Sequence, residues 1–196
     1  MDFNMSRRSL ICLVAAALSL ATGLLVLGCA KDEGTQIAKA HHEAAAALMA
    51  KNDFNGAIQK YTKAIEANPR SDLDYEGRGT AYSELKSYDL AIADFSKAIE
   101  LAPSRGGPYF GRGVAYRLQG NLDAAIADLS HAIGDMSKTR WRGALYERGL
   151  AYKAKGSFAE ARADFQKILD LEAEKPGEAD KSWADKARAE LAALGK

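Results

Sequence analysis

The chain repeats itself at an interval of 34 residues, and this period limits the folds open to it more than any other feature. Gly79 returns as Gly113, and the run Ala91–Asp94 returns at 125–128, each 34 positions later. A related run follows at 161–164, after 36 positions. Such a period is typical of solenoids built from one repeated supersecondary unit. We therefore divide the chain into four units, 38–71, 72–105, 106–141 and 142–175.

Each unit is predicted to form two helices joined by a turn. In the second unit Tyr75 and Tyr82 lie at helical spacing, and Phe95 and Ile99 mark the apolar face of a second helix. Small residues recur on these faces and predict close helix packing, because Gly in a helix costs about 1 kcal/mol and calls for a structural reason. They are Ala57, Ala91, Ala125 and Ala161 on the second helices and Gly79, Gly113 and Gly149 on the first.

These features resemble the tetratricopeptide repeat (TPR) family over residues 38–175. The match consists of the period, Pro69 and Pro103 at the ends of two units, and two recurring patterns. Gly-x-x-Tyr recurs as Gly79…Tyr82, Gly113…Tyr116 and Gly149…Tyr152, and Ala-x₃-Phe as Ala91…Phe95 and Ala161…Phe165. The resemblance implies an all-α fold, a right-handed α-solenoid of four TPR helix-turn-helix units.

Two units depart from the family pattern. The first has Ala45 and Leu48 where the others have Gly and Tyr. The third has Leu129 in place of Phe and two extra residues, so we expect a distorted second helix or a longer loop around 134–139.

The segment 176–196 is predicted to be a capping helix. Trp183, Ala187, Leu191 and Leu194 lie on one helical face, and charged side chains lie elsewhere. The end unit of a solenoid needs a polar outer face, which an amphipathic helix supplies. Binding to a membrane surface is the alternative, and the mixed charges of this segment argue against it.

Residues 1–28 are predicted to be a signal peptide of the lipoprotein type. Arg7 and Arg8 precede an apolar run from Leu10 to Leu27, and Cys29 follows in the sequence L-V-L-G-C. This ending resembles a bacterial lipobox, which implies cleavage before Cys29 and acylation of that cysteine, for example with palmitate. An uncleaved transmembrane anchor and ordinary secretion are the alternatives. The two arginines also leave twin-arginine export open beside the general route.

Cleavage at this point would leave a chain without net charge, because Arg7, Arg8 and Asp2 would depart from a total of +1. No basic stripe indicates binding to nucleic acid. Cys12 would also leave, so a disulfide and a catalytic thiol are both excluded. We expect a flexible tether over 29–37 and an exported, lipid-anchored protein of the cell envelope, on the periplasmic face of the outer membrane.

Three arginines recur in the middle of the first helices, and three aspartates in the middle of the second. Both sets are almost equidistant from the connecting turn, so an antiparallel hairpin brings them level. The first unit has Ala44 and Lys60 at these positions and lacks both partners. We therefore predict structural pairs within units, and not a phosphate-binding loop, since the neighbouring glycines lie inside a helix. The pairs are Arg78–Asp94, Arg112–Asp128 and Arg148–Asp164.

The sequence favours no catalytic site. His41 and His42 are adjacent, so they cannot share a helix face as metal ligands, and His131 is isolated. No Ser, His and Asp set has supporting spacing. We expect no enzyme and no cofactor.

The TPR resemblance implies that the first helices line a concave groove for a partner peptide or helix. Its apolar and aromatic centre, flanked by basic residues, has the chemistry of interface hot spots. We expect a non-catalytic adaptor or scaffold for a protein partner, with a solute or lipid carrier, or a regulatory subunit of a cell-wall hydrolase, as alternatives. The predicted groove residues are Glu76, Thr80, Phe110, Val114, Arg117, Tyr146, Leu150 and Lys153, with His42, Ala46, Met49 and Ser83 on the same faces.

Overall fold

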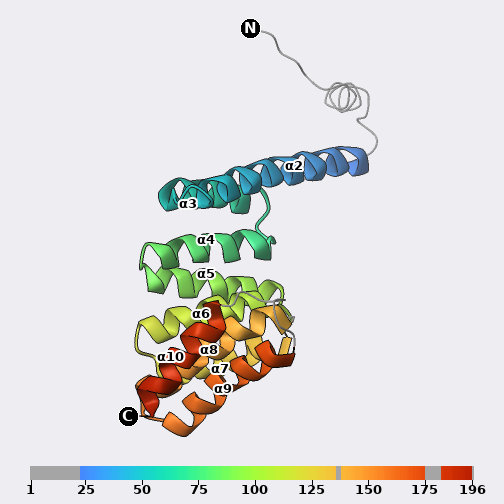
Figure 1. Ribbon diagram of the computed structural model, residues 1–196. Coiled ribbons are helices and arrows are strands. Elements are labelled where there is room, and N and C mark those ends of the chain that lie inside the picture. The colour runs from blue at the N-terminus through green and yellow to red at the C-terminus, as the bar shows by residue number, and fades with distance from the viewer. Residues whose placement is uncertain (1–22, 136–137, 175–181, 196) are drawn as a thin grey trace.

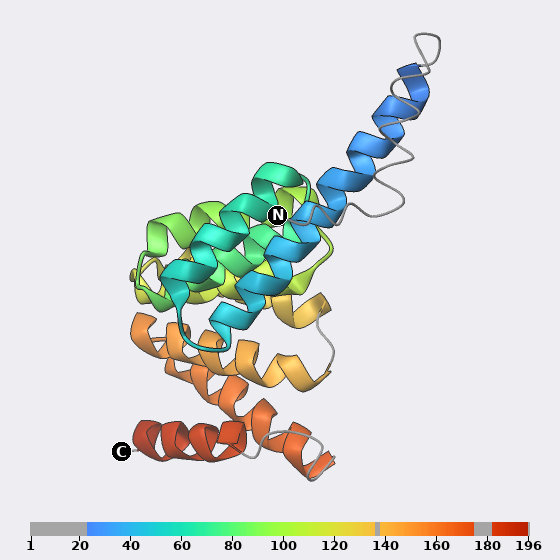
Figure 2. The same cartoon turned by 90° about the horizontal axis from the view of Figure 1, so that it is seen from above.

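The computed structural model describes residues 23–135, 138–174 and 182–195, and every regular element in these ranges is a helix (Figure 1). Eight helices form four hairpins that stack into a helical repeat solenoid, and a ninth follows at the C-terminal end (Figures 1 and 2). The hairpins are α2 (Gly23–Met49) with α3 (Phe54–Ala67), α4 (Asp72–Glu84) with α5 (Tyr88–Leu101), α6 (Gly106–Leu118) with α7 (Leu122–Asp135), and α8 (Lys138–Lys155) with α9 (Phe158–Glu174).

The turn inside each hairpin has one residue in the left-handed conformation. In the third hairpin this residue is Gly120, with φ +83°. The amide of Asn121 donates to the carbonyl of Tyr116 across it, at 2.9 Å, and so satisfies a carbonyl at the end of α6. The same bond recurs in all four turns, where the left-handed residues are Asn52, Lys86, Gly120 and Gly156.

Glycines on the first helices let the second helices approach closely, as the sequence predicted. A Cβ on Gly113 would lie 2.8 Å from Leu129, and one on Gly149 would lie 2.7 Å from Phe165. The recurring alanines of the second helices are fully buried at the same contacts; they are Ala57, Ala91, Ala125 and Ala161. The core is therefore a series of small clusters along the solenoid, of which one joins α2, α3 and α4 and another joins α7 and α8.

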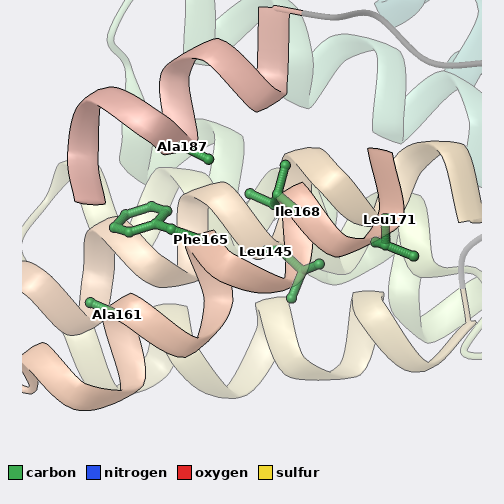
Figure 3. Packing of buried hydrophobic residues seen from close by; sticks show 6 residues of the cluster. All are labelled: Leu145, Ala161, Phe165, Ile168, Leu171 and Ala187. Atoms are coloured by element: carbon green, nitrogen blue, oxygen red, sulfur yellow. The ribbon is translucent and has the colours of Figure 1, made fainter. Parts of the chain in front are cut away.

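α10 (Ser182–Leu194) closes the end of the solenoid. Its residue Ala187 belongs to a cluster of buried side chains that also contains Phe165 and Ile168 of α9. Figure 3 shows six side chains of this cluster. Trp183, Leu191 and Leu194 pack against the same cluster. All four residues predicted for the apolar face of the capping helix thus contact the last hairpin.

Two expectations about irregular segments were wrong. The predicted tether, 29–37, continues α2 as regular helix, because Ala30 to Glu33 are helix-compatible and no Pro interrupts them (Figure 2). α7 has 14 residues, the same length as α3 and α5, so the second helix of the third unit is not shortened. Instead α8 begins at Lys138 and reaches 18 residues, so part of the insertion near 134–139 lengthens that helix. Residues 136–137 lie outside the described part.

Candidate functional site

A cleft of about 600 Å³ opens along the first helices of the second, third and fourth hairpins. It is open to solvent, and Trp183 of α10 and Phe95 of α5 complete its walls. The side chains and backbone that line it from the first helices are Glu76, Thr80, Ser83 and Glu84 of α4, Gly107, Phe110, Gly111 and Val114 of α6, and Gly143 and Glu147 of α8.

Glycines make room for the cleft. Gly107 and Gly111 lie one helical turn apart on α6, so this strip of the helix presents backbone instead of side chains. A Cβ on Gly107 would lie 2.4 Å from a carboxylate oxygen of Glu76. On α8, Gly143 lies in ordinary contact distance of both Phe110 and Trp183. The aromatic rings therefore converge at the end of the cleft that α10 closes.

Four of the eight predicted groove residues line this cleft, namely Glu76, Thr80, Phe110 and Val114. The other four do not, because neighbouring elements occupy their side chains. The ring of Tyr146 lies 5.5 Å from that of Trp183, between ring centroids, and Leu150 packs against the core cluster of α9. The capping helix thus covers part of the face of α8 that was predicted to line the groove.

The two basic residues predicted for the groove, Arg117 and Lys153, do not line this cleft and are paired with carboxylates. Arg117 donates to Glu147 at 2.7 Å, and Lys153 donates to Glu190 of α10 at 2.6 Å. Each cation thus meets a carboxylate from the following hairpin or from the cap. Burial, assisted by the charges of Glu190 and Glu147, raises the pKa of Tyr146 between these two pairs. The charged residues that do line the cleft are all glutamates.

Sequence reasoning missed Glu147 and Trp183 as groove residues. Glu147 stands where the second and third units have Gly77 and Gly111, so this break in the repeat was a usable signal. Gly111 packs against the large ring of Phe95, whereas the residue equivalent to Phe95 in the third unit is the shorter Leu129. Trp183 was assigned only a packing role, because the position of a terminal helix cannot be read from the repeat.

The recurrent arginines are held by two hairpins each. Arg112 donates from Nε to Asp128 at 2.7 Å and from a terminal nitrogen at 3.0 Å, the partner that the hairpin register predicts. Its remaining terminal nitrogen donates to Ser96 of the preceding hairpin at 2.9 Å. Arg78 and Arg148 bind Asp94 and Asp164 in the same way, with Thr62 and Ser130 as the additional acceptors.

These arginines are structural side chains and leave no nitrogen free for an anionic ligand. The hydrogen bond that Arg112 donates to Asp128 is the largest cause that raises the pKa of Arg112, against the opposing effect of burial. Tyr109 and Tyr116 flank the guanidinium within 6.0 Å of their ring centroids. A charged arginine is therefore stable in this half-buried place.

Two of the three histidines have structural partners. His42 lies 2.7 Å from the buried carboxylate of Asp74 on the next hairpin, and His131 stacks on Tyr109 with 3.7 Å between ring centroids. Across the described residues, no group of three His, Cys, Asp or Glu side chains could hold a metal ion.

None of the described helices is long and apolar enough to cross a membrane. Most of the apolar run from Leu10 to Leu27 lies outside the described residues, as does most of the predicted signal peptide. Cys29, the predicted site of lipid attachment, falls within α2.

Comparison with known families identifies the repeat. Family models described as tetratricopeptide repeat match residues 38–71, 75–105, 107–134 and 143–175, which together span the four hairpins. No curated protein matches the sequence significantly.

Solved structures share the fold. A crystal structure of MamA protein has a TM-score of 0.65 at 22% identity and covers 82% of this chain and 87% of its own. PilF of Pseudomonas aeruginosa has a TM-score of 0.69 at 19% identity and covers 84% of this chain and 68% of its own. The second TPR domain of Spaghetti (RPAP3), bound to the HSP90 peptide SRMEEVD, has a TM-score of 0.53 at 25% identity and covers 55% and 98%.

Proposed function

The chain belongs to the tetratricopeptide repeat family, and from this premise we propose a lipid-anchored adaptor that holds a partner protein at a membrane of the bacterial cell envelope. Repeats of this family and its structural neighbours support the general role of a protein–protein interaction adaptor. The proposal adds the place, the anchor and the surface that binds.

The open cleft beside Phe110 is the observation that carries the binding site. Phe110 is only half-buried although it is aromatic: it packs on the cluster that contains Leu129 and also lines the open cleft. Partially exposed aromatic side chains in a concave surface are common anchors for a partner. A cleft open to solvent suits a segment of a protein, whereas a carrier of solutes or lipids would need an enclosed cavity.

The anchor is supported by the sequence around Cys29. An acyl chain contributes about 0.8 kcal/mol for each buried CH₂, so a lipidated cysteine with several chains would hold the adaptor firmly. We assign the protein to the periplasmic face of the outer membrane. The part of α2 ahead of residue 38, where the first repeat begins, would then separate the cleft from the lipid surface.

The binding surface can be tested by affinity capture after mild cross-linking in cells. Phe110→Ala should remove the principal partner from the captured proteins, while Phe158→Ala should retain it. Phe158 is an exposed aromatic residue at the start of α9 and lies outside the cleft, which makes it a matched control. Circular dichroism would establish that both variants fold. Identical partners for Phe110→Ala and the unchanged chain would reject the cleft as the binding site.

Membrane attachment has a separate test. Cys29→Ala should move the protein from the membrane fraction to the soluble fraction and abolish labelling by a palmitate analogue. Retention of Cys29→Ala in the membrane fraction would instead support an uncleaved anchor. Separation of inner and outer membranes would test the assigned location.

A further inference from the structure

The cleft has charged residues of one sign only. Glu76 and Glu84 line it from α4 and Glu147 lines it from α8, whereas no lysine, arginine or histidine is among the lining residues. The three carboxylates therefore surround the apolar strip of α6 that contains Phe110 and Val114.

The carboxylates differ in how far they are neutralised. Oε2 of Glu76 accepts from Arg105 at 2.6 Å, and Oε2 of Glu147 accepts from Arg117, so the second oxygen of each group has no cation assigned to it. Arg105 is shared with Asp72, which leaves this group of charges acidic. Glu84 is exposed, and no hydrogen bond or ion pair joins it to another side chain among the described residues.

This arrangement disfavours an acidic ligand. A carboxylate placed in the cleft would meet like charges, because the neighbouring cations Arg105 and Arg117 already donate to Glu76 and Glu147. Such like-charge contact costs free energy in a partly desolvated site. The RPAP3 domain is, by contrast, bound to SRMEEVD, a peptide rich in carboxylates. A shared fold therefore does not bring a shared ligand here.

We infer that the cleft takes a cationic amphipathic segment of a partner protein, an inference that rests on the function proposed above. Apolar side chains of the segment pack on Phe110, Val114 and Trp183. Its lysine or arginine side chains meet Glu84 and the free oxygens of Glu76 and Glu147. Charge complementarity of this kind contributes to specificity and association rate, while the aromatic contact supplies most of the affinity.

Three labelled peptides with the same Leu and Phe positions test the inference by fluorescence anisotropy on the full chain. Their remaining positions are Lys in the first peptide, Gln in the second and Glu in the third. The Lys peptide should bind about tenfold more tightly than the Gln peptide, the Glu peptide should bind most weakly, and added salt should reduce the difference. SRMEEVD serves as a fourth probe and should not bind.

Variants show where the charge acts. Glu84→Lys should weaken binding of the Lys peptide about tenfold, because it places a like charge at the cleft. Glu66→Lys makes the same change at an exposed position of α3 outside the cleft and should leave the affinity unchanged. Phe110→Ala should weaken binding of the Lys and Gln peptides alike.

The outcomes separate this inference from the function on which it rests. Equal binding of the Lys and Gln peptides, lost in Phe110→Ala, would keep the cleft as a binding site and overturn its preference for cations. Tighter binding of the Glu peptide would overturn it too. An equal effect of Glu84→Lys and Glu66→Lys would show that the peptide responds to overall charge and not to the cleft. Failure of all the peptides to bind would contradict both proposals.

Discussion

The ring of Phe95 occupies the space where a side chain on Gly111 would begin, so that a Cβ at position 111 would lie 2.5 Å from the ring. The same ring also limits Gly79, where a Cβ would lie 3.1 Å away. Phe95 thus packs between a glycine of its own hairpin and a glycine of the next. One side chain thus joins two repeats. It also explains why Gly79 stands next to Arg78 and Gly111 next to Arg112, since a larger residue at either position would collide with the ring.

Gly111→Ala should therefore destabilise the protein although alanine favours helix. A forced contact in a packed core costs about 1–3 kcal/mol, which exceeds the gain of about 1 kcal/mol in helix propensity. Gly134→Ala is the control, because Gly134 is exposed at the end of α7 and has nothing within 4 Å of the new Cβ. Urea unfolding should show a lower midpoint for Gly111→Ala and an unchanged or higher one for Gly134→Ala.

Arg112→Ala should cost about 3 kcal/mol of unfolding free energy, because it leaves the buried carboxylate of Asp128 without its cation. Removal of both partners should cost less than the sum of the two single changes. The exposed pair Lys97–Glu100 offers a comparison, and Lys97→Ala should cost less than about 1 kcal/mol. Additive effects at positions 112 and 128 in denaturant titrations would contradict a coupled pair.

Lys86→Gly should stabilise the turn of the second hairpin. Lys86 has a φ of +59°, and a left-handed residue other than Gly costs about 1–2 kcal/mol. Greater freedom of Gly in the unfolded chain offsets part of this gain, so we expect a net increase of about 0.5 kcal/mol. Gly120→Ala makes the reverse change at the equivalent turn and should lower the melting temperature. Melting curves of both variants provide the measurement.

The stability of the protein should fall at alkaline pH partly through Tyr61. Burial first, and then the charges of Asp74 and Glu76, raise the pKa of Tyr61 above its ordinary value of 10.0. The unfolded chain then loses this proton first as the pH rises, so the contribution to stability is complete below about pH 10 and is lost as the pH rises through the folded pKa. Between about pH 9 and pH 11, the melting temperature of Tyr61→Phe should fall by less than that of the unchanged chain. Parallel losses in the two proteins would contradict this role.

Ala187→Asp should detach the capping helix from the last hairpin. Ala187 is fully buried in the cluster with Phe165, and an unpaired carboxylate there has no hydrogen-bonding partner to compensate for lost solvation. Amide hydrogen exchange should rise in α9 and α10 but not in α4 and α5, because each repeat contacts mainly its neighbours. Ala192→Asp, at an exposed position of α10, is the matched control and should leave exchange unchanged.

The hairpins could be predicted because their geometry is local. A short turn fixes the register of two antiparallel helices, so Arg78 and Asp94 had to lie level once the turn was placed. Recurring small residues predicted close packing at Gly113, and helical periodicity placed Ala187 on the apolar face of the cap. The groove was harder to predict. The TPR resemblance, carried along the helical spacing, pointed to Phe110 and Val114. The side chains that meet Arg117 and Lys153 belong to another hairpin and to the capping helix.

The sequence by itself thus determined the repeat, the pairing of helices within each unit and the arginine–aspartate pairs, since these depend on contacts near in sequence. Only the tertiary structure decided that Glu147 neutralises Arg117, that α10 covers Tyr146, and that the cleft is acidic. The physical reason is the stacking of successive hairpins. The angle between neighbouring units selects which side chains about one repeat apart come into contact, and no local pattern in the sequence encodes that angle.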